Sequence, residues 1–280
     1  MKLVTLTDNR THAPELKTEH GLSVYIETEQ HKILFDTGQS GLFVENAEQL
    51  GVDLKAVDMA IISHGHYDHI GGLPHFIQLN PDAPIIMKRE VFDTPYQSIK
   101  AGKVKQIGPS DELKQQMDRF TFPSEVITSI DNIHIIQRID TPYPRPKGNQ
   151  LLYKTEAGES VHDDFQHELL LVIENEGKLV VFTGCAHHGV LNMIHTAKQH
   201  FPNEPIQLVF GGFHLISPNS FAEVESEADL QQITQALQEL IDPQTAIYTG
   251  HCTGEDVSTT LTQQLGHNLR QFYTGLTLHL

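Results

Sequence analysis

Short runs of apolar residues separated by polar turns predict β-structure in the first third of the chain. The run Lys2–Thr7 has the length and apolar character of a short strand. Residues 22–28 alternate between apolar and polar side chains, and the apolar run 32–35 follows after a polar turn, so these two segments predict a β-hairpin. Two further apolar runs, 57–62 and 84–87, predict buried strands.

Helical spacing of apolar residues appears between these strands and returns in the last third of the chain. Between residues 42 and 50 the apolar side chains share one helical face, and Gly51 stands where such a helix would end. Two similar halves that each combine strands with helices favour an α/β fold, a four-layer αββα sandwich formed by one domain over residues 1–280. The remaining predicted helices are 73–79, 190–200, 228–240 and 257–265, and the remaining strands are 168–173, 178–183, 207–210 and 246–249.

The stretch from about residue 88 to residue 163 has a weaker apolar pattern and is rich in proline. Its segment 141–146 contains three prolines, which fix the backbone and remove hydrogen-bond donors, so this segment is extended or looped. We interpret residues 88–163 as a family-specific insertion near the active site. The apolar spacing predicts a partly helical segment at 111–120 and a strand at 133–136.

The charge of the chain limits the partners that we expect. The formal net charge is −17, with 36 Asp and Glu against 19 Lys and Arg. Such an acidic surface repels nucleic acids and anionic membranes, so we expect a small-molecule substrate and neither of these partners. Between Lys88 and Lys154 the balance reverses, because this stretch holds 11 of the basic and 8 of the acidic residues. It is either a solvated helical face or a surface that helps to hold an anionic substrate.

Targeting signals and cysteines add little to the prediction of function. No run of about 18 apolar residues is present, which predicts no transmembrane helix. The first ten residues turn polar too soon for a signal peptide, so we expect a cytoplasmic protein. Cys185 and Cys252 are the only cysteines, which argues against a disulfide scaffold, although their number allows one disulfide. The oligomeric state is left open.

Four side chains of metal-ligand type stand within six residues, directly after the predicted strand 57–62. His64 and His66 are two positions apart, so an extended backbone directs both rings to the same side. Asp68 and His69 follow on a tight turn and would face a second position. Imidazole and carboxylate ligands suit zinc, iron or manganese. The sequence therefore predicts a site for two divalent metal ions, with zinc favoured and iron or manganese as alternatives.

This string, His64-Gly65-His66-Tyr67-Asp68-His69, resembles the signature motif of the metallo-β-lactamase superfamily. Residues 34–38 resemble the motif that precedes it, whose Asp, here Asp36, supports the metal loop from behind the ligands. The resemblance covers nearly the whole chain and extends to the subgroup often labelled 7,8-dihydropterin-6-yl-methyl-4-(β-D-ribofuranosyl)aminobenzene-5′-phosphate synthase. Further motifs of this subgroup are found at residues 8–9, 20–23, 36–41, 183–187, 211–215 and 251–254.

The resemblance implies two more ligands in the second half of the chain. His187 lies in the loop after the predicted strand 178–183, where the first metal needs a third ligand. His251 ends the predicted strand 246–249, where the superfamily places the last ligand of the second metal. Together with the four residues of the signature motif, these two histidines complete the predicted ligand set.

The sequence departs from the superfamily pattern at Cys185, which stands where the usual bridging Asp is expected. Cys185 is either a thiolate ligand or a small buried residue that only packs against the site. Without a bridging Asp the second metal would be weak, labile or of a different type. His214, at the end of the predicted strand 207–210, is a ligand, a substrate contact or a proton donor.

These features predict a metallohydrolase, or a related transferase, that acts on a small anionic substrate through a metal-activated hydroxide. Asp68 would serve as ligand and proton acceptor, and His214 as the acid that protonates the leaving group. The resemblance implies a phosphorylated or pterin-like substrate. The alternatives are an iron-bound oxidoreductase of the same fold and a ligand-binding sensor with a weakened second metal site. A nuclease of this fold is opposed by the net charge of −17.

Overall fold

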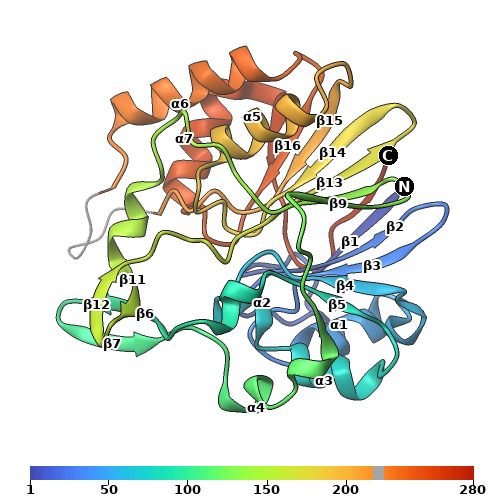
Figure 1. Cartoon of the computed structure of the whole chain (residues 1–280). Coiled ribbons are helices and arrows are strands. Elements are labelled where there is room, and N and C mark those ends of the chain that lie inside the picture. Colours follow the sequence, from blue (N-terminus) through green and yellow to red (C-terminus); the bar gives the residue numbers. More distant parts are fainter. Residues whose placement is uncertain (217–223) are drawn as a thin grey trace. The chain divides into compact units, whose positions relative to one another are not determined.

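The computed structural model describes residues 1–216 and 224–280 and falls into two compact units (Figure 1). Unit 1 consists of Met1–Tyr96, Gln106–Ser124 and Phe272–Leu280, and unit 2 consists of Gln97–Lys105 and Glu125–Gln271. Each unit has its own seven-stranded sheet and its own hydrophobic core. The two similar halves predicted from the alternation of strands and helices correspond to these units.

A seven-stranded mixed sheet forms the centre of unit 1. In spatial order its strands are β18 (Thr277–His279), β1 (Lys2–Thr7), β2 (Ser23–Glu27), β3 (Lys32–Phe35), β4 (Met59–Ile61), β5 (Ile85–Ile86) and β8 (Phe120–Thr121). The first four strands pair with one another in antiparallel fashion, which confirms the predicted β2–β3 hairpin. From β3 to β8 the pairing is parallel. Parallel strands end at the same edge, and the loop after β4 lies there.

Short helices cover this sheet. They are α1 (Leu42–Gln49), α2 (Tyr67–Ile70), α3 (Leu73–Leu79) and α4 (Asp111–Lys114), with 3₁₀ turns at Leu54–Ala56, Arg89–Phe92 and Met117–Arg119. Phe43 of α1 and Phe76 of α3 are fully buried and pack in one cluster with Leu34 and Ala60 of the sheet. The helix predicted at 111–120 is shorter than expected, because the segment changes to a 3₁₀ turn and then pairs with the sheet as β8.

Unit 2 is built on a second seven-stranded sheet. In spatial order its strands are β17 (Leu269–Gln271), β16 (Ala246–Thr249), β15 (Ile206–Phe210), β14 (Lys178–Phe182), β13 (Leu170–Asn175), β10 (Ile133–Ile136) and β9 (Ile127–Ile130). The strands from β14 to β17 are parallel, so the loops that follow β14, β15 and β16 emerge at one edge. The remaining pairs are antiparallel.

Three helices pack beside one another on the sheet of unit 2 (Figure 1): α5 (Val190–His200), α6 (Glu227–Leu240) and α7 (Glu255–Leu265), the last followed by the 3₁₀ turn Gly266–Asn268. Their apolar stripes enter one core, in which Ile194, Leu237 and Leu261 are fully buried against Val181 and Ile247. The predicted bounds of α5 and β16 match the observed ones, and α6 and α7 begin one and two residues earlier than predicted.

The proline-rich stretch 88–163 does not form a separate body. Its strands β8, β9 and β10 belong to the two main sheets. The rest contributes the 3₁₀ turn Lys147–Leu151 and a four-stranded sheet in the order β12 (Glu159–His162), β11 (Leu152–Glu156), β6 (Tyr96–Lys100) and β7 (Lys103–Gln106). The strand predicted at 133–136 is confirmed as β10, whereas the four-stranded sheet was not predicted.

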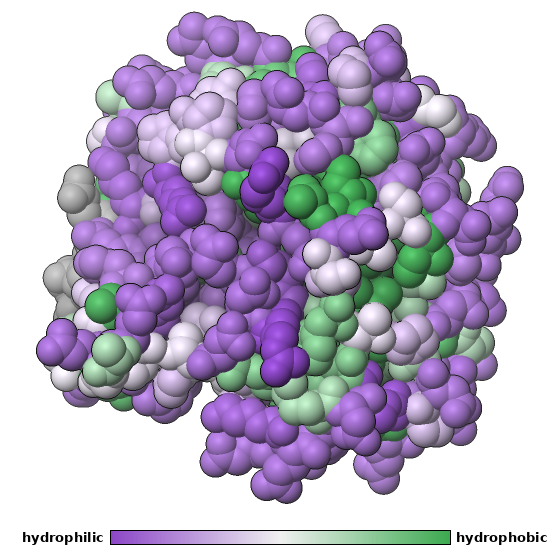
Figure 2. Space-filling view, in the orientation of Figure 1, coloured by the Kyte–Doolittle hydropathy of each residue, from purple (hydrophilic) through white to green (hydrophobic). Residues whose placement is uncertain are grey.

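Hydrophilic residues predominate on the face shown in Figure 2, where hydrophobic side chains form smaller groups. Among the described residues, the large hydrophobic side chains that are clearly exposed are Val104 and Val126. In the same part of the chain no helix combines the length and apolar character needed to cross a membrane. The apolar side chains therefore lie mainly in the two hydrophobic cores.

We expect Asn46→Ala to destabilise unit 1. Asn46 is buried on α1, donates to the carbonyl oxygens of Leu6 and Lys17 at 2.8 and 2.9 Å, and accepts from the Lys17 backbone N–H at 3.1 Å. The alanine leaves these groups without a partner, which should lower the free energy of unfolding by about 2–4 kcal/mol in urea denaturation. Asn203→Ala, on an exposed turn, is the control and should stay within about 0.5 kcal/mol of the parent.

Candidate functional site

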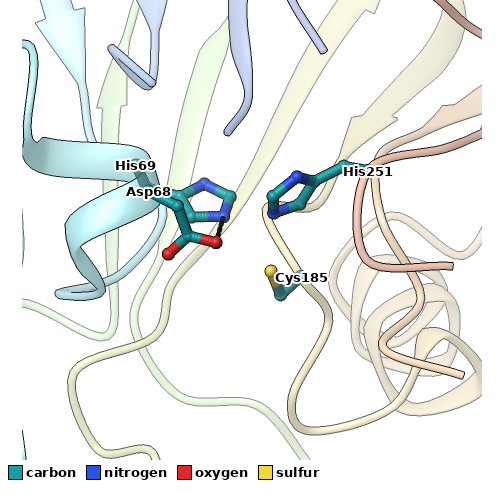
Figure 3. Close-up of side chains that lie close together, drawn as sticks. All are labelled: Asp68, His69, Cys185 and His251. Atoms are coloured by element: carbon teal, nitrogen blue, oxygen red, sulfur yellow. Dashed lines mark ion pairs between the residues drawn. The ribbon is translucent and has the colours of Figure 1, made fainter. Parts of the chain in front are cut away.

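The loop after β4 brings the four residues of the signature motif together within unit 1. His66 has extended backbone angles and precedes α2, so Asp68 and His69 lie in its first turn. All four side chains are buried. The ring centroid of His64 lies 4.6 Å from that of His66 and 4.1 Å from that of His69. The Nε2 atom of His69 lies 3.9 Å from Oδ2 of Asp68, as the dashed line in Figure 3 marks.

A buried carboxylate, Asp36, holds this loop in place. Asp36 follows β3, is fully buried and has a positive φ of 57°. Its Oδ1 accepts from the backbone N–H of Ser63 at 2.8 Å, and its Oδ2 accepts from the Ser63 hydroxyl at 2.7 Å and from Nδ1 of His69 at 2.6 Å. Because Nδ1 of His69 carries the proton, Nε2 is the atom that can bind a metal.

The His64 ring is oriented in the same way. The Ser63 hydroxyl donates to Asp36 and therefore accepts from Nδ1 of His64 at 2.9 Å, which assigns Nε2 of His64 as the metal donor. His20 approaches Oδ2 of Asp68 with its Nε2 at 3.2 Å. His20 is half exposed and was not predicted as a site residue, since it lies far from the motif in sequence.

The two glycines that follow His69 are explained by close backbone contacts. A Cβ on Gly72 would lie 2.1 Å from the carbonyl oxygen of Thr37, and one on Gly71 would lie 2.3 Å from that of Gln39. Thr37 also donates from its hydroxyl and its N–H to the carbonyl oxygen of His69, at 2.9 and 2.8 Å. The glycines therefore let the metal loop pack directly on the segment after Asp36.

In unit 2 the remaining site residues lie in the loops after the parallel strands. Cys185 and His187 follow β14, His214 follows β15, and His251 with Cys252 follows β16. The side chains of Cys185 and His251 are drawn in Figure 3. His214 and His251 have positive φ angles of 50° and 53°, and Ala186 between Cys185 and His187 has 51°. Non-glycine residues with positive φ angles are strained, and such strain is concentrated at functional sites.

His187 is fixed on three sides. Its ring stacks on that of Phe165, with centroids 4.4 Å apart and an interplanar angle of 4°. The amide of Asn149 donates to the His187 carbonyl at 2.7 Å, so its Oδ1 accepts from Nδ1 of His187 at 3.0 Å. This assigns Nε2 of His187 as the metal donor. The His214 ring lies beside it, with centroids 4.4 Å apart.

Glu168 holds the same loop from inside the unit. It is fully buried, and its carboxylate accepts from the backbone N–H groups of His187 and His188 at 2.7 and 2.8 Å and from Nδ1 of His188 at 2.6 Å. Burial alone raises the pKa of Glu168, but the hydrogen bonds and the charge of His188 outweigh it and lower the pKa. His188 thus points to Glu168.

Two other acidic residues of unit 2, Asp163 and Asp164, have different surroundings. Asp163 is buried and its Oδ2 lies 3.0 Å from Nε2 of His167. Asp164 is partly exposed and pairs with Nζ of Lys154 at 3.0 Å, where its charge helps to raise the pKa of that lysine. Asp163 is therefore part of the buried polar structure of unit 2, and Asp164 belongs to its surface.

Cys185, His214 and Cys252 form a cluster within unit 2. Their donor atoms, two sulfurs and one ring nitrogen, all lie within 4.8 Å of one another. The backbone N–H of His214 donates to the Cys252 sulfur at 3.2 Å, and the Cys252 thiol donates to the Cys185 carbonyl at 3.8 Å. Burial raises the pKa of the Cys252 thiol, but its contacts with Cys185 and His214 and the charges of His251 and His214 hold it well below its usual range.

The donor chemistry in each unit fits divalent metal ions. In histidine ligands one ring nitrogen binds the metal while the other donates to a fixed acceptor. His64, His69 and His187 each satisfy this condition, with acceptors on Ser63, Asp36 and Asn149. Of these three acceptors, only Asp36 could be predicted from a motif. Ser63 and Asn149 carry no spacing signal, and Cys252 was noted only as a cysteine.

Comparison with known proteins supports the family resemblance found in the sequence motifs. The sequence profile of the metallo-β-lactamase superfamily matches residues 16–200. The 7,8-dihydropterin-6-methyl-4-(β-D-ribofuranosyl)-aminobenzene-5′-phosphate synthase of Methanocaldococcus jannaschii is 27% identical over 272 residues, which span 92% of this chain and 89% of that protein. The resemblance stated from the motifs is therefore confirmed.

Solved structures confirm the fold class. Tm1679, a metal-dependent hydrolase of the β-lactamase superfamily, is 29% identical with a TM-score of 0.82, over 100% of this chain and 99% of that one. Zn²⁺-bound PqqB from Methylobacterium extorquens is similar in fold alone, with 10% identity and a TM-score of 0.57 over the whole of both chains. The predicted α/β sandwich of the metallo-β-lactamases is the fold of this chain.

We expect Glu168→Gln to destabilise the protein at neutral pH by about 2–4 kcal/mol, because the neutral amide weakens three hydrogen bonds to a buried charge. The folded pKa of Glu168 is lowered, so its contribution is fully present above the ordinary value of 4.5 and is lost as the pH falls through the folded value. The difference in unfolding free energy between parent and variant should therefore shrink as the pH decreases below that value.

Urea unfolding curves recorded across this pH range measure the effect. Glu176→Gln, in the exposed turn between β13 and β14, is the matched control and should stay within about 0.5 kcal/mol of the parent. A difference between parent and Glu168→Gln that stays constant or grows on acidification would contradict the assigned role of the carboxylate.

Proposed function

The chain belongs to the metallo-β-lactamase superfamily, and we propose that it is a metal-dependent hydrolase, or a related transferase, that acts on a small anionic substrate. The observation that carries this proposal is the set of buried imidazoles whose Nδ1 atoms are each engaged by a fixed acceptor, with Nε2 oriented for a metal. The similarity to Tm1679, itself described as a metal-dependent hydrolase, supports it.

We propose two divalent ions, with zinc favoured and iron or manganese as alternatives. His64, His66 and His187 are the proposed ligands of one ion, and Asp68, His69 and His251 are those of the other. This assignment rests on the donor chemistry of each unit and on the family. Cys185 is a further candidate ligand, since it stands in the sequence where the bridging Asp of the superfamily is expected.

Bound divalent ions lower the pKa of water and polarise the bond under attack. Within this chain, Asp68 is the proposed proton acceptor, because its Oδ2 is held by His20 at 3.2 Å and its side chain is 9% exposed. His214 is the proposed acid for the leaving group. It is partly exposed, lies against the His187 ring and is held in a strained backbone conformation. Asp36, Glu168 and Asn149 keep the ligand rings in position.

For the substrate we propose a phosphorylated or pterin-like molecule. The relative from Methanocaldococcus jannaschii is named as a synthase of a dihydropterin-linked aminobenzene ribofuranosyl phosphate. The stretch from Lys88 to Lys154, which reverses the acidic balance of the chain, supports an anionic substrate. The test is metal analysis of the purified protein followed by a panel of phosphoesters, lactones, thioesters and phosphorylated pterins. Turnover of none of these after reconstitution with zinc, iron and manganese would count against the proposal.

We expect His66→Ala to lower the metal content by about one ion per chain and to abolish turnover, because it removes a ligand that no neighbour replaces. Elemental analysis after gel filtration measures the content. His267→Ala, an exposed histidine after α7, is the control and should keep both metal and turnover. A His66→Ala protein with full metal content would refute the ligand assignment.

We expect Asp36→Asn to bind metal about 10–100-fold more weakly while keeping the fold, because the amide no longer fixes the proton on Nδ1 of His69. Competition with a chromogenic chelator gives the affinity, and circular dichroism checks the fold. An unchanged affinity in a folded Asp36→Asn variant would show that His69 is not a ligand.

A further inference from the structure

We infer that Cys185 and Cys252 are a hydroperoxide-sensitive thiol pair that closes to an intramolecular disulfide. They are the only cysteines of the chain, and neither forms a disulfide in the structure. They come from different loops of unit 2, after β14 and after β16, and their sulfur atoms lie within 4.8 Å of each other. The two loops are brought together because their strands, with β15 between them, are parallel and end at one edge.

The Cys252 sulfur is directed towards Cys185 by its surroundings. A Cβ on Gly212 would lie 2.5 Å from this sulfur, so the glycine makes the space that the thiol occupies. The His214 backbone N–H donates to the sulfur at 3.2 Å, and the thiol donates to the Cys185 carbonyl at 3.8 Å. The sulfur is thus held next to the Cys185 backbone rather than facing away from it.

Closure needs only a small movement. A disulfide places its sulfurs about 2.05 Å apart, so from a separation within 4.8 Å the two loops must approach by less than about 3 Å. Both cysteines lie outside helices and strands, Cys185 before α5 and Cys252 before α7, so the movement does not require a regular element to break. Loops of this kind absorb such shifts more easily than the sheet beneath them.

The oxidant is a hydroperoxide, a small molecule that reaches the partly exposed Cys252 more readily than the buried Cys185. One thiol sulfur attacks the peroxide oxygen, the O–O bond breaks, and a sulfenic acid and an alcohol or water are formed. The second thiol then attacks the sulfenic sulfur, the S–O bond breaks and water leaves with the proton of that thiol. In sum, two thiols lose two electrons and two protons, and one peroxide takes up both.

The consequence for the metal ligands rests on the proposed function. Cys185 is two residues from His187, and Cys252 is adjacent to His251. A bond between the cysteines therefore moves the loops that carry the two proposed ligands of unit 2. We expect the disulfide form to lose metal, and reduction followed by metal addition to restore it.

The experiment treats the full-length protein, as purified with its metal, with hydrogen peroxide. It is then denatured and alkylated, and its intact mass is measured. The expected product is a monomer lighter by two hydrogen atoms that takes up no alkyl group, and dithiothreitol restores both alkylations. Cys252→Ser and Cys185→Ser should show no such loss of hydrogen, and their thermal unfolding without oxidant shows whether they are folded. If one serine variant does not fold, the other still supplies the comparison.

The proposal is overturned if the oxidised parent still takes up two alkyl groups, or if it gains oxygen atoms on separate thiols as the single-cysteine variants would. Metal content is measured on the same samples. A disulfide that forms in a protein that held no metal before the oxidant was added would support the thiol pair and count against the proposed function. A metal-containing, active protein in which no disulfide forms would support the proposed function and overturn the thiol pair.

Discussion

The proposed metal site depends first on the buried carboxylate of Asp36. A charged group without contact to water is costly, and here three donors compensate that cost: the Ser63 backbone, the Ser63 hydroxyl and the His69 ring. These bonds connect the end of β3 to the loop after β4. The position of the His69 ring is therefore determined by the sheet of unit 1, and His64 is oriented through the same serine. A single carboxylate thus couples the fold of this unit to the direction of two candidate ligands.

In unit 2 a different buried carboxylate, Glu168, holds a loop by the same type of interaction. Glu168 is as deeply buried as Asp36, and it binds the backbone of His187 and His188 together with the His188 ring. In both units an internal carboxylate organises a loop at the edge where parallel strands end. Polar groups in such positions are expensive unless every donor and acceptor is matched, and here the matching also selects one tautomer and one ring orientation.

The sequence predicted those parts of the molecule that depend on local pattern. Lys2–Thr7, Ile133–Ile136, Val190–His200 and Ala246–Thr249 have the observed bounds, because their apolar spacing is strong. The four-stranded sheet was missed, since β7 is exposed throughout and has no apolar face to detect. The motif spacing likewise located His64 to His69. His20 and Asn149 were missed because their roles arise from contacts with residues distant in sequence, Asp68 and His187, which no spacing rule reveals.

The pairing of β18 with β1 has a consequence for how the protein is made. Lys2 lies opposite His279, and the amino group of Met1 donates to the carbonyl of Leu280 at 3.0 Å. During synthesis β1 is made long before β18, so one edge of β1 stays unpaired until unit 2 has been translated. An open strand edge can pair with other chains, so the nascent polypeptide passes through a stage in which it is prone to aggregate. The order of translation, rather than the stability of the finished sheet, sets how long this strand edge stays unpaired.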